Sequence, residues 1–436
     1  MKKTAILTAL AAITILTSCA DVPDNVKDRK QGQEDKVEIK DGVTVDKLLE
    51  GAEDIPAYIK AHGYEGKFLL DEDVHIELPE HLYELETETV TDAHLKFPEI
   101  YSELFKRDFY TDSGVKELSE LPPGSQHHNE HGFFFDDWSN TGDSIIYTDG
   151  DADPPEYTRR LDVSTGGFMY FRDEKGYSYD GALREIIRAG STPLPDREFT
   201  LLNNEKCSLK AIAEYAESRL NTVFGYFGDQ YTYRAGMIYP YTSDNEKTWF
   251  YIDMEKCYKG VPFCNHIIMD HTSEGRRQFA PIYVAEMDES QHIFDIDCPF
   301  GIDRVTSENE LTEGLVSLPQ ALDIMNNELS PKIELRISDI RLCYMCDYDS
   351  EDVDAVIKLR ETAEYQDMSR EQQLLLGNPT LLPGRKYTAY PVWEFRLDRQ
   401  QRDEAGNYLQ QEACDIITVD VRTGKLSEYF DKVAQR

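Results

Sequence analysis

Two stretches of the chain predict its fold: residues 317–329 read SLPQALDIMNNEL, and residues 208–220 read SLKAIAEYAESRL. In both, apolar residues follow a serine at spacings i, i+3, i+4, i+7 and i+11, which places them on one side of an α-helix. Ser208 and Ser317 stand where a helix N-cap is expected, and Gln320 completes a capping-box pattern with Ser317. The sequence therefore predicts two capped amphipathic helices, 109 residues apart.

Each predicted helix is followed by runs of apolar, β-favouring residues. After the first they cover 231–234, 248–254, 281–287 and 292–296, and after the second 332–337, 387–397, 416–421 and 426–430. A helix with one apolar stripe must bury it, and one face of such a sheet is the natural partner. We therefore predict an α+β fold of tandem units, each with one amphipathic helix packed on an antiparallel sheet. Two units are clear, and a degenerate third is expected upstream because Asp162–Gly166 echoes Asp420–Gly424.

The C-terminal runs also carry a family resemblance. Tyr390-Pro391-Val392-Trp393-Glu394-Phe395 and the hairpin Ile417–Leu426 resemble a PepSY-type unit, clearly over residues 315–430 and partly over 205–297. The layout resembles uncharacterised lipoproteins of clostridia-like bacteria and the YycH and YycI class of extracytoplasmic regulatory proteins. The resemblance implies PepSY/cystatin-like folds and protein–protein regulation at the cell envelope. It supplies no catalytic residue.

The first nineteen residues have the features of an export signal. Lys2 and Lys3 precede an apolar run from Ala5 to Leu16, which is too short to span a bilayer. The run ends in Leu16-Thr17-Ser18-Cys19, which resembles the lipobox of bacterial lipoproteins. The resemblance implies cleavage before Cys19, a diacylglycerol on its thiol, and a protein anchored at the extracytoplasmic face of the cell membrane. An ordinary cleaved signal is the alternative.

The remaining chain divides by composition and pattern. Residues 20–42 are charged and predict an acidic flexible tether. Residues 43–200 form the degenerate N-terminal α+β region, residues 201–310 one PepSY-like unit, and residues 311–436 a second with an insert at 347–385.

The charge of the chain restricts its partners. It has 46 basic and 83 acidic residues, a formal net charge of −37, and such a field repels phosphate backbones. Nucleic-acid binding is excluded on this ground, and contact with the membrane is expected only through the lipid on Cys19.

Two clusters could hold a metal ion. His127, His128 and His131 could bind zinc or nickel, although Pro122-Pro123-Gly124 favours a solvated loop. Asp149, Asp151 and Asp153 lie two apart as in a calcium loop, but the glycine and glutamate of an EF-hand are missing and a plain turn is the alternative. No cofactor is predicted.

The cysteines do not describe a disulfide scaffold. Seven follow Cys19, and an odd number leaves buried free thiols as the default. Cys257 and Cys264 flank a predicted turn and are the candidate disulfide pair. Cys343 and Cys346 have thioredoxin spacing, but they stand on a predicted strand, where residues three apart face opposite sides.

No nucleophile elbow, phosphate loop or catalytic triad pattern is present. We therefore expect a non-enzymatic, lipid-anchored protein that binds or regulates another envelope protein. The alternatives are a glycan- or cell-wall-binding lipoprotein, suggested by 26 tyrosines, and an envelope hydrolase.

Overall fold

The computed structural model describes residues 42–70, 76, 78–124, 126–138, 142–149, 159–177, 179, 181–189, 194–264, 267–270, 277–279, 283–298, 302–329, 335–348, 384, 386–397 and 416–430. Cys19, the tether up to residue 41, and residues 349–383 of the predicted insert lie outside the described residues.

The two capped helices form as predicted. Helix α6 (Leu209–Gly225) begins at Ser208, whose side chain accepts a hydrogen bond from the amide of Ala211 at 3.2 Å. Helix α7 (Leu318–Glu328) begins at Ser317, and both hydrogen bonds of the capping box are present. The apolar stripe of each helix is buried. The local pattern therefore specifies both helices and the face that each one buries.

The other helices of the described chain are short. They are η1 (Val45–Lys47), α3 (Ile55–Ala61), η2 (Ala93–Lys96), α4 (Phe97–Phe105), α5 (Phe109–Ser113) and η3 (Leu118–Glu120). Among the described residues, none of the helices is long and apolar enough to cross a membrane.

The strands join into two large sheets. The nine-stranded sheet contains β1 (Phe68–Leu70), β2 (Tyr83–Thr89), β14 (Ile267–Asp270), β15 (Arg277–Phe279), β18 (Asp303–Glu310), β19 (Leu335–Tyr348), β20 (Lys386–Leu397), β21 (Ile416–Asp420) and β22 (Leu426–Phe430). The thirteen-stranded sheet contains β3 (Phe133–Trp138), β4 (Gly142–Thr148), β5 (Arg159–Ser164), β6 (Met169–Asp173), β7 (Ala182–Leu183), β8 (Ile187–Arg188), β9 (Glu198–Leu201), β10 (Lys206–Ser208), β11 (Tyr231–Thr242), β12 (Lys247–Tyr258), β13 (Val261–Pro262), β16 (Tyr283–Glu289) and β17 (His292–Cys298).

The predicted fold class is wrong. The chain is not a series of tandem α+β units of the PepSY/cystatin type but a largely β protein with two multi-stranded sheets. Strand β2 pairs with β18 and β20, and β14 pairs with β22, so segments far apart in sequence share one sheet. Periodicity shows which face of a strand is buried, but it does not show which strand lies at each edge, and exposed edges pair across predicted unit boundaries.

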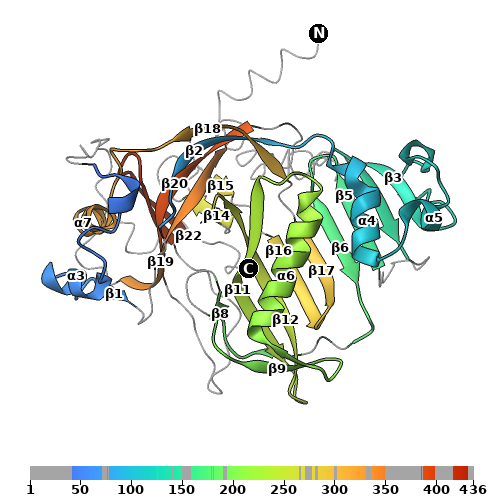
Figure 1. Ribbon diagram of the computed structural model, residues 1–436, viewed down its shortest axis with the longest axis horizontal. Helices are drawn as coiled ribbons and strands as arrows, with labels where there is room; N and C mark the ends of the chain where they lie inside the picture. The colour runs from blue at the N-terminus through green and yellow to red at the C-terminus, as the bar shows by residue number, and fades with distance from the viewer. Residues whose placement is uncertain are drawn as a thin grey trace, which may run out of the picture.

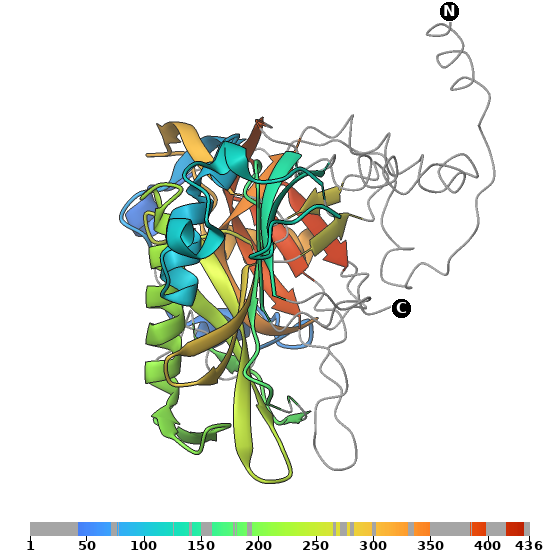
Figure 2. The ribbon, with the colours of Figure 1, turned by 90° about the vertical axis from the view of Figure 1, so that its right-hand side faces the viewer.

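Helices cover one face of each sheet. Helices α4 and α6 pack on the thirteen-stranded sheet around one core cluster, which includes Phe97, Leu220 and Phe250. Helices α3 and α7 pack against a second cluster on the nine-stranded sheet, which includes Ile59, Leu322 and Trp393 (Figure 1). Figure 2 shows α4 and α6 together along one side of the molecule.

The two sheets meet where β12 and β13 approach β19. The amide of Cys264 donates to the carbonyl of Tyr344 at 2.8 Å, and Phe263 forms an isolated parallel bridge with Tyr344. This junction places side chains from both sheets around the candidate site.

Candidate functional site

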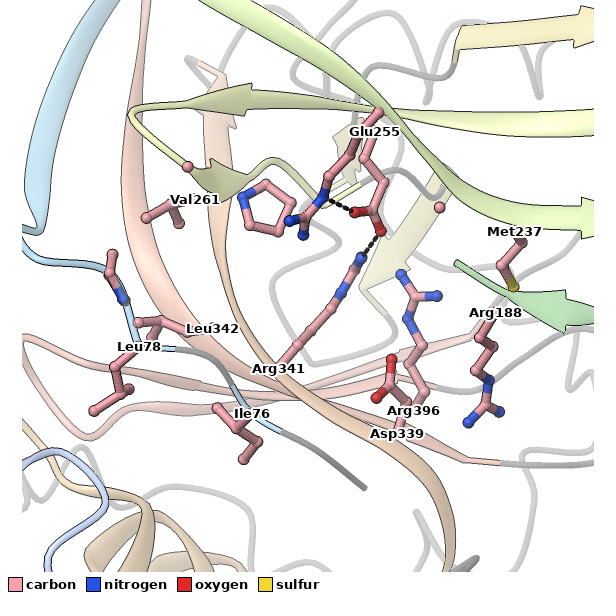
Figure 3. Close-up of a pocket in the computed structure, with 15 residues that line it drawn as sticks. Ile76, Leu78, Arg188, Met237, Glu255, Val261, Asp339, Arg341, Leu342 and Arg396 are labelled. Atoms are coloured by element: carbon pink, nitrogen blue, oxygen red, sulfur yellow. Dashed lines mark hydrogen bonds and ion pairs between the residues drawn. The ribbon is translucent and has the colours of Figure 1, made fainter. Parts of the chain in front are cut away.

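A cavity of about 220 Å³ lies at the junction of the two sheets. Four arginines line it, together with two carboxylates and a set of apolar side chains. The charged residues are Arg188, Arg234, Glu255, Asp339, Arg341 and Arg396. Figure 3 shows Ile76, Leu78, Leu342 and Val261 on one side of the cavity and Arg188, Asp339 and Arg396 on the other.

Strand alternation explains how charges come to line an interior cavity. On β19, Ile337, Ile340 and Leu342 belong to the core beneath α7, so Asp339 and Arg341 project from the opposite face. The ladder sets Asp339 opposite Arg396 and Arg341 opposite Glu394. The apolar positions of these strands therefore serve the core and the intervening charged positions serve the cavity, although Leu342 also reaches the cavity wall.

The arginines and glutamates of the two sheets form one buried network. The Nε of Arg341 donates to Glu394 at 2.8 Å, and its Nη1 forms an ion pair with Glu255 across the junction. Arg234 reaches Glu255 at 3.0 Å, and Arg396 reaches Glu394 at 2.6 Å. A buried charge requires a hydrogen-bonded partner of opposite sign, and the two glutamates supply it for three of the arginines.

Arg188 differs from the other three arginines. Its Nη1 donates to the backbone carbonyl of Ser338, which is neutral, and it forms no ion pair with a carboxylate of the described chain. Ser338 directly precedes Asp339, so this hydrogen bond holds the guanidinium of Arg188 close to the Asp339 backbone. Arg188 is therefore a cation at the cavity wall whose hydrogen-bonded partner carries no charge.

Gly236 leaves room for the side chain of Glu255 in the cavity wall. The ladder between β11 and β12 shifts register at Gly236, between Ala235 and Met237. A Cβ atom at Gly236 would lie 2.5 Å from the Cγ of Glu255, closer than real atoms approach. The bulge and the missing side chain therefore make room for the carboxylate that joins Arg234 to Arg341.

The network shifts the pKa values of its members. Burial alone would raise the pKa of Glu255, but the guanidinium groups around it lower that pKa below its ordinary range. Burial and the nearby Arg341 oppose ionisation of Arg396, yet carboxylates that include Glu394 and Asp339 raise its pKa. The charges of the network therefore persist at neutral pH.

The predicted histidine site has no grouping of metal ligands in the described chain. His127, His128 and His131 are exposed in the loop before β3, and His131 lies 3.5 Å from Glu130. The compact groups of three metal-ligating side chains found among the described residues do not include them.

The predicted calcium loop falls mostly outside the described residues. Asp151 and Asp153 are not described, and Asp149 accepts a hydrogen bond from the amide of Arg159 at 2.7 Å. That bond joins the residue after β4 to the first residue of β5.

The candidate disulfide pair consists of free thiols in this structure. Cys257 and Cys264 are both buried and unbonded to each other. Cys343 and Cys346 face opposite sides of β19, as strand geometry predicts, because each lies in a different core cluster. The thiol of Cys343 donates to Glu394 at 3.3 Å.

A second polar cluster lies at the β16–β17 turn. The Nδ1 of His292 lies 2.6 Å from Asp288, and its Nε2 lies 3.6 Å from Asp173. Burial opposes protonation of His292, but the neighbouring carboxylates of Asp173 and Asp288 raise its pKa above the ordinary value. Tyr179 donates to the second oxygen of Asp288 at 3.2 Å. The carboxylates of this cluster thus already have protein partners.

Most of the tyrosines whose side chains the structure describes lie on strands and are buried or half-buried. Among them only Tyr110 is exposed, with 44% of its surface accessible. The glycan-binding alternative requires a solvent-facing row of aromatic rings, and the described surface gives it no such support.

We expect the protein to be most stable at mildly acidic pH. Burial raises the pKa of Glu286 to about 7 and those of Asp295, Asp253 and Asp162 to about 6. A pKa that is raised on folding stabilises the folded state below the unfolded-state pKa, and this stability is lost as pH rises through the folded-state pKa. The same sign holds for His292.

The free energy of unfolding should therefore fall as pH rises from about 5 to 8, by at most about 1.4 kcal/mol per pH unit for each proton released. Thermal unfolding across this range measures the slope, and Glu286→Gln should flatten it between pH 6 and 8. A stability that rises over this range would contradict the prediction.

None of the cavity residues was among the predicted site residues. A signal was nevertheless present, because Asp339, Arg341, Glu394 and Arg396 interrupt runs otherwise typical of buried strands. Charges at alternate positions of such runs indicate a second face that is buried and polar.

Comparison with known proteins does not assign a function to this cavity. No protein-family model matches the sequence, and no curated protein matches it. The crystal structure of an uncharacterized protein from Eubacterium rectale is similar, with a TM-score of 0.48 and 12% sequence identity over 83% of this chain and 90% of that chain. A likeness of this degree carries no conclusion about function.

Proposed function

We propose that the protein is a non-enzymatic, extracytoplasmic binding protein whose inter-sheet cavity takes a small anionic ligand. The observation that carries the proposal is Arg188, a cation at the cavity wall whose hydrogen-bonded partner is a neutral carbonyl. Guanidinium groups recognise carboxylates and phosphates by paired, charge-assisted hydrogen bonds.

Among the four guanidinium groups of the lining, Arg188 is the one available to an anion. Glu255 and Glu394 pair with Arg234, Arg341 and Arg396, whereas Arg188 donates to a neutral carbonyl. The volume of about 220 Å³ suits a small molecule, since a cavity of about 150 Å³ can hold benzene.

The proposed location follows from the lipobox at Cys19. The same anchor supports the proposal that another envelope protein binds the ligand-bound form of this protein. The anchor is tested by fractionating cells that produce the Cys19→Ala variant, which should lose membrane attachment. Retention of that variant on membranes would remove the anchor from the proposal.

Removing the Arg188 guanidinium should weaken anion binding. Hydrogen bonds to charged groups contribute about 1.5–3 kcal/mol, so Arg188→Gln should bind propionate or inorganic phosphate about 10- to 100-fold more weakly than the wild type. Titration calorimetry on the purified chain measures both affinities.

Arg197→Gln is the matched control, because Arg197 is exposed, pairs with Glu185 and does not line the cavity. It should bind as the wild type does. Equal affinity of Arg188→Gln and wild type, or no binding of either anion by the wild type, would overturn the proposal.

A further inference from the structure

We infer that the ligand of this cavity is a free α-amino acid with an apolar side chain, its carboxylate held at Arg188 and its ammonium group at Asp339. This inference rests on the proposed function, because it assigns the same cavity a more specific ligand. Three features of the wall lead to it: a buried carboxylate that makes no hydrogen bond within the described chain, a guanidinium on the same wall and an apolar end.

The first feature is the carboxylate of Asp339. The residue is 94% buried, lines the cavity, and makes no hydrogen bond or salt bridge within the described chain. Its cross-strand neighbour Arg396 attracts it electrostatically but donates its hydrogen bond to Glu394, at 2.6 Å. A buried carboxylate without a hydrogen-bonded partner is costly, and an ammonium group with three donors would supply one.

The second feature is the position of Arg188 relative to Asp339. The hydrogen bond from Arg188 to the carbonyl of Ser338 places the guanidinium beside the residue that precedes Asp339. A positive and a negative group thus line the same wall (Figure 3), and they form no salt bridge with each other within the described chain. In an α-amino acid the ammonium and carboxylate are separated by one carbon atom, which suits two such groups on neighbouring parts of one wall.

The third feature is the opposite end of the cavity. Ile76, Leu78, Leu342 and Val261 lie there, across from Arg188, Asp339 and Arg396 (Figure 3). Apolar walls with a few fixed polar groups are typical of small-molecule sites. The apolar end would receive an aliphatic side chain, while the charged end orients the backbone of the ligand.

The experiment measures binding of each of the twenty L-amino acids to the purified chain by calorimetry. The tightest ligand is then compared with its deaminated acid and its decarboxylated amine. An aliphatic amino acid should bind best, and loss of either charged group should weaken binding about 10- to 100-fold.

Asp339→Asn separates this inference from the proposed function. The variant should bind the amino acid about 10- to 100-fold more weakly and the deaminated acid at least as well as the wild type does. If the wild type binds the deaminated acid as tightly as the amino acid, the inference fails while anion binding stands. If no carboxylate binds, both fail.

Discussion

Replacing Asp303 with asparagine should lower the free energy of unfolding by about 3–5 kcal/mol, because it leaves the buried ammonium group of Lys256 without a counter-charge. Lys256 is 1% exposed, and its Nζ lies 2.8 and 2.9 Å from the two carboxylate oxygens of Asp303. The rings of Phe263 and Tyr231 stand 4.1 and 4.5 Å from the same nitrogen. Lys256 belongs to β12 and Asp303 to β18, so the pair ties the two sheets together.

A neighbouring pair provides the matched control. Lys259 and Glu308 join the same two segments at 2.7 Å, but both side chains are exposed, and Glu308→Gln should cost about 1 kcal/mol or less. The double variant Lys256→Met with Asp303→Leu should recover most of the lost stability, since it removes both buried charges. Urea denaturation followed by circular dichroism measures all four proteins. An Asp303→Asn variant no less stable than Glu308→Gln would contradict this account.

Replacing Trp393 with alanine should cost about 3–5 kcal/mol of unfolding free energy, because the indole is fully buried and its loss leaves a cavity. The indole N–H also donates to the carbonyl of Val316 at 2.8 Å. Val316 directly precedes Ser317, the N-cap of α7, so Trp393 fixes the start of that helix on β20. The variant therefore removes packing and leaves a buried carbonyl without its donor.

Trp249→Ala is the comparison. Its indole donates to the carbonyl of Tyr179 at 3.0 Å, but the side chain is only partly buried, and the cost should be smaller. Trp393→Phe keeps most of the ring volume and should fall between the wild type and Trp393→Ala. Denaturation by urea, followed by circular dichroism, ranks the variants. A Trp393→Ala cost equal to that of Trp249→Ala would show that burial of Trp393 does not set its contribution.

The site illustrates why sequence patterns locate a core more readily than a binding cavity. Arg188 and Arg234 lie on β8 and β11, and Arg341 and Arg396 lie on β19 and β20. More than 200 residues separate the first from the last, so no local spacing connects them. The histidine and aspartate runs at 127–131 and 149–153 were predicted as metal sites because their residues are close together in sequence. The residues of the cavity are close together only in the folded structure.

The sequence by itself determined the local elements of this protein. The serine caps of α6 and α7, the buried stripes of both helices and the β21–β22 hairpin follow from contacts between residues a few positions apart. Such interactions depend on spacing and side-chain chemistry, and both can be read along the chain.

Only the tertiary structure decided how these elements assemble. The pairing of β2 with β20, of β14 with β22, and of Glu255 with Arg341 joins segments between 86 and about 300 residues apart. The free energy of such contacts depends on which strand edge and which face are left unfilled by the rest of the fold. For that reason the chain forms two large sheets with a charged cavity between them, where the repeated local pattern predicted separate units.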